Sequence, residues 1–113
     1  MKVAIATNRG GLDDEIADRF GRAPTFTIVE IDDTNHEIKR TYVVENPGSI
    51  AGSGAGIKAV QKLIEEGVSI AIGPNPGPNA LVALESSGIR VYSYVGLKAR
   101  EALEKVLQEL RQA

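Results

Sequence analysis

The sequence contains no cysteine and a single histidine, His36. Without cysteine the chain has no disulfide, no thiolate nucleophile, no cysteine-ligated iron-sulfur cluster and none of the usual structural zinc sites. A lone histidine in a predicted turn also provides no base-nucleophile pair for hydrolysis. We therefore expect no catalytic residue and no direct metal ligand, and so a protein that is not an enzyme.

Long hydrophobic runs are absent as well. The first apolar segment, residues 3–7, is shorter than the core of a signal peptide, and no stretch approaches the roughly 18 apolar residues of a membrane span. Thirteen Lys and Arg against fifteen Asp and Glu leave a formal charge of -2. Such a small charge does not hold a nucleic-acid backbone or an anionic membrane non-specifically. These features predict a cytoplasmic protein that binds neither nucleic acid nor membrane.

What remains is an ordinary globular composition over a short length. The chain has 113 residues, 42% of them hydrophobic and 25% charged. These values exclude disorder and low-complexity architectures, and the length corresponds to one domain. We expect a single domain over residues 1–113.

Hydrophobic patterning predicts alternating strands and helices. Short apolar or β-branched runs predict strands at residues 3–7, 25–31, 38–45, 68–72 and 90–92. Apolar residues at helical spacing, with glycine or proline at the ends, predict helices at residues 56–66, 78–86 and from about 98 onward. A turn cluster at residues 32–35 makes the second and third strands a hairpin. This order predicts an α/β fold with helices on both faces of the sheet.

The topology also predicts where a ligand binds. If the hairpin brings the third strand parallel to the first, and helices make the later connections, the parallel strands end at one edge. The loops at that edge are residues 8–22, 46–56, 73–79 and 93–97, which carry most of the glycine and proline. Ligands of open α/β sheets bind beyond the carboxyl ends of parallel strands. We therefore expect the binding site at this edge.

Five segments of the chain resemble the dinitrogenase iron-molybdenum cofactor biosynthesis family, in the same order. They are VAIAT (3–7), ADRFGRAPTF (17–26), GAGI (54–57), GPNAL (77–81) and GIRVY (88–92). The resemblance extends from residue 1 to about residue 104. It implies a three-layer α/β/α domain, with a five-stranded mixed sheet and a ribonuclease-H-like motif.

The resemblance further implies a role in holding iron-molybdenum cofactor, its precursors or a related molybdenum or iron-sulfur cluster. Cluster donor or acceptor proteins are the partners that such a role implies. The ribonuclease-H-like motif does not by itself predict a nuclease, because residues 3–7 and 68–72 contain no carboxylate to hold catalytic metals.

The loop at residues 46–56 is the first candidate for cluster binding. It opens onto a predicted helix, and the free backbone N-H groups of a helix start attract anions. Gly54, Ala55 and Gly56 form that start, and Lys58 follows them. Ser53 stands where the family often has histidine, so we expect binding without an imidazole ligand. A loop of this kind also serves simply to pack a helix against a sheet.

Two further loops complete the predicted site. Arg22 follows the flexible Gly21 and offers a planar fork of donors to an anion, although it could instead pair with Asp13, Asp14 or Asp18. The proline-rich loop supplies the amides of Asn75 and Asn79, and it could equally be a rigid strand-to-helix connection. The residues predicted to bind the cofactor are Asn8, Arg22, Ser53, Gly54, Ala55, Gly56, Lys58, Asn75, Gly77 and Asn79.

A second class of function uses the same loops. Open N-H groups at a helix start also bind phosphate. The alternative hypothesis is therefore a small regulatory domain that binds a phosphate-bearing metabolite.

Overall fold

The computed structural model describes residues 1–112; Ala113, the last residue of the domain expected from the sequence, lies outside the described residues. The strands are β1 (Lys2–Thr7), β2 (Thr25–Ile31), β3 (Ile38–Glu45), β4 (Ile70–Gly73) and β5 (Arg90–Ser93). The helices are the 3-10 turn η1 (Pro47–Ile50), α1 (Ala55–Glu66), α2 (Pro78–Ser86) and α3 (Ala99–Gln112). No helix of this part of the chain is long and apolar enough to cross a membrane.

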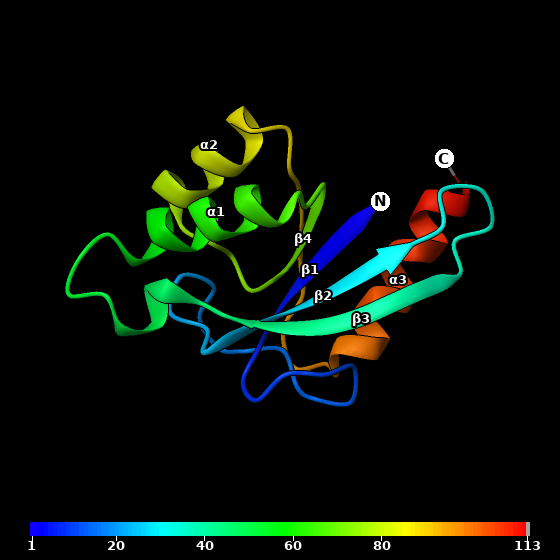
Figure 1. Cartoon of the computed structure of the whole chain (residues 1–113), viewed down its shortest axis with the longest axis horizontal. Helices are drawn as coiled ribbons and strands as arrows, with labels where there is room; N and C mark the ends of the chain where they lie inside the picture. The colour runs from blue at the N-terminus through cyan, green and yellow to red at the C-terminus, as the bar shows by residue number, and fades with distance from the viewer. Residues whose placement is uncertain (113) are drawn as a thin grey trace.

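The five strands form one mixed sheet in the order β3-β2-β1-β4-β5 (Figure 1). Strand β2 is antiparallel to both β1 and β3, whereas β1, β4 and β5 are parallel. Strand β3 therefore runs parallel to β1, as the hairpin and the helical connections predict. The arrangement is that of a ribonuclease-H-like motif, so the expected fold class is confirmed.

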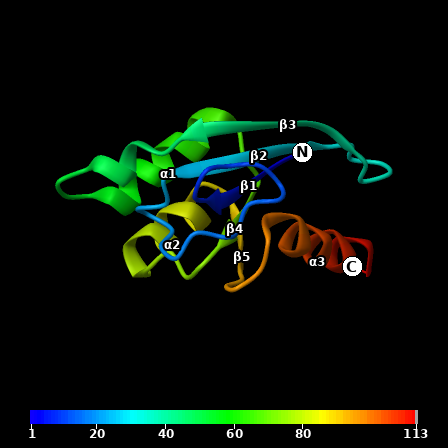
Figure 2. The same cartoon turned by 90° about the horizontal axis from the view of Figure 1, so that it is seen from below.

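Helices cover both faces of the sheet, which makes three layers (Figure 2). One core packs Ala4 and Ala6 of β1 against α1 and α2, and the other packs Val3 and Ile5 against α3. The alternation follows from the two-residue repeat of a strand. Helices α1 and α2 lie on the same face because both crossovers move across the sheet in the same direction, and parallel crossovers are right-handed.

Local sequence explains where the elements end. Gly54 and Gly67 flank α1 with left-handed backbone, at φ 69° and 75°. Both positions favour glycine because a Cβ disfavours positive φ. The expected bounds of β2 and β3 match the structure, whereas β4 begins two residues later than its apolar run, at Ile70.

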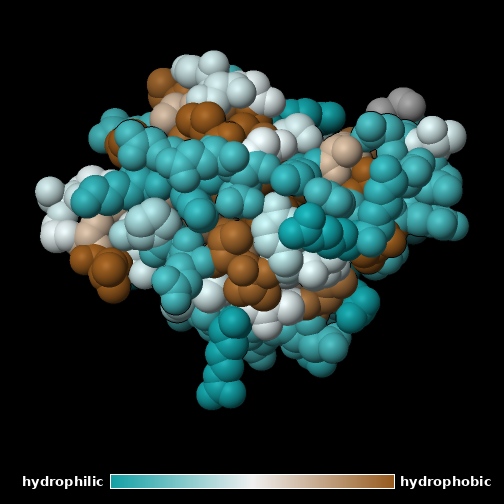
Figure 3. Space-filling model, viewed as in Figure 1, coloured by the Kyte–Doolittle hydropathy of each residue, from teal (hydrophilic) through white to brown (hydrophobic). Residues whose placement is uncertain are grey.

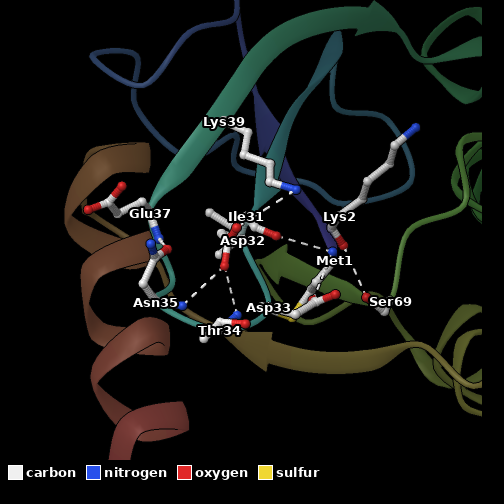
Figure 4. A network of polar contacts seen from close by, with 10 residues as sticks. All are labelled: Met1, Lys2, Ile31, Asp32, Asp33, Thr34, Asn35, Glu37, Lys39 and Ser69. Atoms are coloured by element: carbon white, nitrogen blue, oxygen red, sulfur yellow. Dashed lines mark hydrogen bonds and ion pairs between the residues drawn. The ribbon is translucent and has the colours of Figure 1, made fainter.

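The hairpin turn between β2 and β3 lies at the amino end of β1, opposite the expected ligand edge (Figure 4). The Asp32 carboxylate accepts the backbone N-H groups of Thr34 and Asn35, at 2.8 and 3.2 Å. The amino terminus of Met1 lies 3.0 Å from Asp33. This turn is thus occupied by its own hydrogen bonds and by the chain terminus.

Candidate functional site

The carboxyl ends of β1, β3, β4 and β5 lie at one edge of the sheet, because these four strands are parallel. We call the loops at this edge, residues 8–24, 46–54, 74–77 and 94–98, the carboxyl rim. All three α-helices begin there, so three sets of helical N-H groups are directed towards the rim. Each helix start needs acceptors from its surroundings, because the first N-H groups of a helix have no partner within it.

The start of α3 is closed by the chain itself. The backbone N-H of Ala99 donates to the carbonyl of Asp14 at 2.8 Å, and that of Arg100 donates to the carbonyl of Leu12 at 2.9 Å. The N-H of Lys98 donates to the Glu101 carboxylate at 2.9 Å. The N-H groups of residues 98–100 therefore all have acceptors within the chain, which closes most of this helix start to a ligand.

The starts of α1 and α2 are open. Each is preceded by a glycine at positive φ, Gly54 or Gly77, and neither has a side-chain cap. The N-H groups concerned belong to Ala55, Gly56, Ile57, Asn79 and Ala80, and none of them has an acceptor within residues 1–112. An N-terminus with unpaired donors and the positive end of the helix dipole favours an anion.

Small residues bring the two open starts together with the loop that carries Arg22. A Cβ added to Gly56 would lie 3.2 Å from the Cβ of Ala80, so α1 and α2 pack closely at their first turns. A Cβ added to Gly21 would lie 3.0 Å from the backbone nitrogen of Gly56. Glycine at both positions therefore lets three segments meet at one place on the rim.

Arg22 is exposed beside these helix starts, and its Nη1 donates to the carbonyl of Ala51 at 2.8 Å. Among the described residues, no carboxylate lies within ion-pair distance of Arg22 or Arg19. Asp13 instead pairs with Arg100 at 3.2 Å. Arg22 therefore forms none of the surface ion pairs that the sequence left open. Its remaining guanidinium N-H groups are available to another anion.

Asp14 is occupied by the loop that follows β1. Its carboxylate accepts the backbone N-H groups of Asn8, Arg9 and Gly10 at 2.7–2.8 Å, and that of Glu15 at 2.8 Å. Burial raises the pKa of this carboxyl, but the four donors outweigh burial and lower the pKa below 3.8. The Asp14 carboxylate is thus occupied by the loop itself, whereas the side chains of Asn8 and Arg9 are exposed.

A hollow of about 230 Å³ lies on this part of the rim. Its walls include Asn8, Asp18, Arg19 and Arg22. A larger hollow, of about 770 Å³, lies between β3, η1 and α1, and Val44, Ile50 and Lys62 are among its walls. The smaller hollow carries Arg19 and Arg22, which form no ion pair within residues 1–112, so we place the candidate site there and at the adjoining helix starts.

Asn46 organises the rim, although the sequence analysis did not single it out. It is only 1% exposed, and its Nδ2 donates to the carbonyls of Gly21 and Ala23 at 3.0 and 2.9 Å. Its Oδ1 accepts the N-H of Gly48 at 2.9 Å, which caps η1. Residues 46–50, the first half of the loop predicted to bind the cluster, are therefore held in place by hydrogen bonds. The sequence Asn-Pro-Gly directly after a strand is a turn signal that could have indicated this.

The structure gathers some of the predicted site residues and separates others. Arg22, Gly54, Ala55, Gly56, Gly77 and Asn79 lie at or beside the two open helix starts. Asn75 instead accepts the N-H of Gly77 at 3.0 Å. Ser53 is exposed and does not cap α1, and Lys58 is exposed on its first turn. Among residues 1–112, no group of His, Cys, Asp or Glu could hold a metal ion.

Fold and site together define a small α/β domain in which two open helix starts and Arg22 lie at the carboxyl edge of the sheet. The sequence profile of the dinitrogenase iron-molybdenum cofactor family matches residues 1–109, and the chain belongs to this family.

Individual proteins agree with this assignment. An uncharacterized protein of Methanocaldococcus jannaschii, MJ0580, is 34% identical over 92 residues, which are 81% of this chain and 73% of that protein. The apo form of the orange protein of Desulfovibrio gigas is similar in structure, with a TM-score of 0.83, 31% identity and coverage of 96% and 88% of the two chains. A putative NifB protein from Thermotoga has a TM-score of 0.75, 35% identity and coverage of 95% and 87%.

Proposed function

We propose that this protein is a carrier that binds an anionic metal-sulfur cluster non-covalently at the carboxyl rim. The cargo in this proposal is iron-molybdenum cofactor, one of its precursors or a related molybdenum or iron-sulfur cluster. The observation that carries the proposal is the difference between the helix starts: that of α3 is closed by Asp14 and Leu12, whereas those of α1 and α2 are open.

The chemistry of the rim suits such a cargo. Sulfide and oxide atoms on the surface of a thiometallate accept hydrogen bonds, and the cluster carries net negative charge. Unpaired N-H groups at two helix starts would meet those atoms, and Arg22 would add a charge-assisted donor from the side. Lys58 is exposed on the first turn of α1, so its positive charge would attract an anion towards the open start of this helix.

Family membership supports the proposal, and the residues present define how the cluster would be held. No cysteine is present, and the one histidine, His36, lies in the turn between β2 and β3 at the opposite end of the sheet. A cluster bound without covalent ligands is held by hydrogen bonds and charge, and can be passed on without breaking a metal-thiolate bond. In this proposal the protein is not an enzyme and exchanges its cargo with donor and acceptor proteins in the cytoplasm.

The test is anaerobic incubation with tetrathiomolybdate, followed by gel filtration and metal analysis. We expect molybdenum to co-elute with the protein, and Arg22→Gln to weaken retention about tenfold because a charge-assisted donor is lost. Arg22→Lys should retain part of the binding, since the charge remains but the fork does not. Arg111→Gln, at the end of α3, is the matched control for the charge change.

Two results would contradict this proposal. One is molybdenum that elutes apart from the wild-type protein under strictly anaerobic conditions. The other is equal retention by wild-type protein and Arg22→Gln, which would place binding elsewhere on the surface.

The same open N-H groups fit a phosphate, which keeps a phosphate-bearing metabolite as the second candidate ligand. Isothermal titration calorimetry against nucleotides and sugar phosphates separates the two candidates. Binding of a phosphate ester with no retention of tetrathiomolybdate would favour the regulatory function, and no binding across the panel would exclude it.

A further inference from the structure

The two edges of the sheet differ in length and exposure. Strand β5 has four residues, whereas β3 has eight, six of which are exposed. Strand β3 pairs only with β2, and no other element covers its outer side (Figure 2). A long edge strand presents a row of unpaired N-H and C=O groups, which other proteins protect or pair.

We infer that β3 pairs antiparallel with β3 of a second copy of this chain, about a two-fold axis at Tyr42. Residues directly opposite each other in a sheet share a face, so the axis of such a pair passes through a residue and not between two residues. In this register the facing pairs are Tyr42 with Tyr42, Thr41 with Val43, Arg40 with Val44 and Lys39 with Glu45. The proposed partner of this edge is therefore β3 of the second copy, running in the opposite direction.

Charge complementarity selects this register. The axis at Tyr42 places Lys39 of each copy opposite Glu45 of the other, and the symmetry forms that pair twice. An axis at Thr41 would place Glu45 opposite Glu37, and an axis at Val43 would place Lys39 opposite Pro47. Opposite charges across a strand pair stabilise it and like charges destabilise it.

Both charged groups are available for this contact. Lys39 is the extra residue at a register shift, where Glu30 faces Arg40 and Ile31 faces Ile38, so it has no partner on β2 and its side chain is not bound to the strict alternation of the strand. Its side chain is 60% exposed, and its ammonium lies 3.9 Å from Asp32, at the limit of an ion pair. Within residues 1–112, the carboxylate of Glu45 forms no ion pair.

The uncharged pairs also fit. Val43 is 45% exposed, and apolar side chains lie among hydrophilic ones on the face that contains β3 (Figure 3). The loop at Gly10 packs against Val43, since a Cβ on Gly10 would lie 2.5 Å from Cγ1 of Val43. The small Thr41 of the second copy fits beside that loop. On the other face, the Arg40 guanidinium lies 4.4 Å from the centre of the Tyr42 ring of the same chain. In the proposed dimer the Arg40–Tyr42 pair of one copy would lie next to that of the other copy.

Pairing in this way joins two five-stranded sheets into one. Because the two β3 strands run in opposite directions, the carboxyl rims lie at opposite ends of the joined sheet and both stay open. Strand pairing over so few residues buries little surface, so we expect a weak dimer that dissociates on dilution.

The test is sedimentation velocity across a range of protein concentrations at low salt. We expect concentration-dependent dimerisation of the wild-type protein. Lys39→Glu and Glu45→Lys should each weaken it about tenfold, since two attractive pairs become repulsive. The double variant Lys39→Glu with Glu45→Lys should restore it, because the pairs form again with their signs exchanged. Glu37→Lys, in the turn outside β3, is the control and should not weaken it.

Circular dichroism of every variant shows whether the fold is retained, and the double variant supplies the comparison if one single variant fails to fold. A wild-type protein that stays monomeric at every concentration would overturn the inference. Failure of a folded double variant to recover dimerisation would overturn the register.

Discussion

Two single side chains, those of Asp14 and Asn46, form hydrogen bonds with backbone groups that the rim loops would otherwise leave unpaired. Asp14 accepts four N-H groups of residues 8–15, and Asn46 makes three hydrogen bonds that join β3, η1 and the Arg22 loop. Buried or partly buried backbone groups need such partners, because an unpaired donor or acceptor carries its full desolvation cost. The shape of the rim therefore depends on two residues whose hydrogen bonds hold its loops together.

Asp14→Asn should lower stability at neutral pH by about 1 kcal/mol, because charge-assisted bonds become neutral ones. The pKa of Asp14 is lowered in the folded protein, so its contribution is present in full above 3.8 and is lost as pH falls through the lower folded value. We therefore expect the difference between wild-type protein and variant to shrink below pH 3.8. Urea unfolding at a series of pH values measures it, with Asp18→Asn as control; parallel curves throughout the acid range would contradict the assignment.

Asn46→Ala should lower the free energy of unfolding by about 2–3 kcal/mol, because it leaves two buried carbonyls and one buried N-H without hydrogen-bond partners. Asn75→Ala removes one exposed hydrogen bond and should cost about 0.5 kcal/mol. Urea unfolding of both variants compares them. Equal losses would mean that Asn46 does not organise the rim.

At the scale of elements, close backbone contacts decide how η1, α1 and the Arg22 loop fit together. Gly48 is buried between the carbonyls of Ala55 and Gly21, and a Cβ at this position would overlap both carbonyl oxygens. Both obstacles are backbone atoms, so they cannot swing aside as a side chain would. The three segments meet only because this position has no side chain.

Gly48→Ala should therefore destabilise the protein by about 2 kcal/mol or more, since backbone must move to admit the methyl group. Gly52→Ala is the matched control, because a Cβ there meets open space and the backbone is not at positive φ. Thermal unfolding followed by circular dichroism gives both values. A Gly48→Ala protein as stable as Gly52→Ala would show that η1 shifts without cost.

At the scale of the whole molecule, the sheet separates two hydrophobic cores that are covered by different numbers of helices. Helices α1 and α2 cover one face, while α3 alone covers the other with Ala99, Ala102, Leu103, Val106 and Leu107. The start of α3 is tied to the loop after β1, so the same contact that closes this helix start also holds the second core in place.

Leu103→Ala should cost about 2–5 kcal/mol, because it leaves a cavity under α3, the helix that covers this face of the sheet within residues 1–112. Because both cores share the same strands, unfolding should remain a single transition. Differential scanning calorimetry tests both points, with the exposed Lys105→Ala as control. Two separate transitions would show that the cores unfold independently.

Much of this architecture followed from local patterns. The bounds of β2 and β3 were predicted without error because their β-branched residues flank a strong turn signal at residues 32–35. The start of β4 was wrong by two residues, because Val68 is apolar for its packing in the core and not for strand pairing. The turn η1 was missed, since its order depends on carbonyls of Gly21 and Ala23 from another loop.

The sequence alone determined the α/β class and the edge at which four loops meet, because hydrophobic period identifies each element and helical crossovers make the strands parallel. It also determined that no thiolate is available there. Only the tertiary structure decided that α3 begins closed and α1 and α2 begin open, and that Arg22 has no carboxylate partner among residues 1–112. The reason is that the acceptors which close a helix start come from residues far away along the chain, and their positions follow from packing.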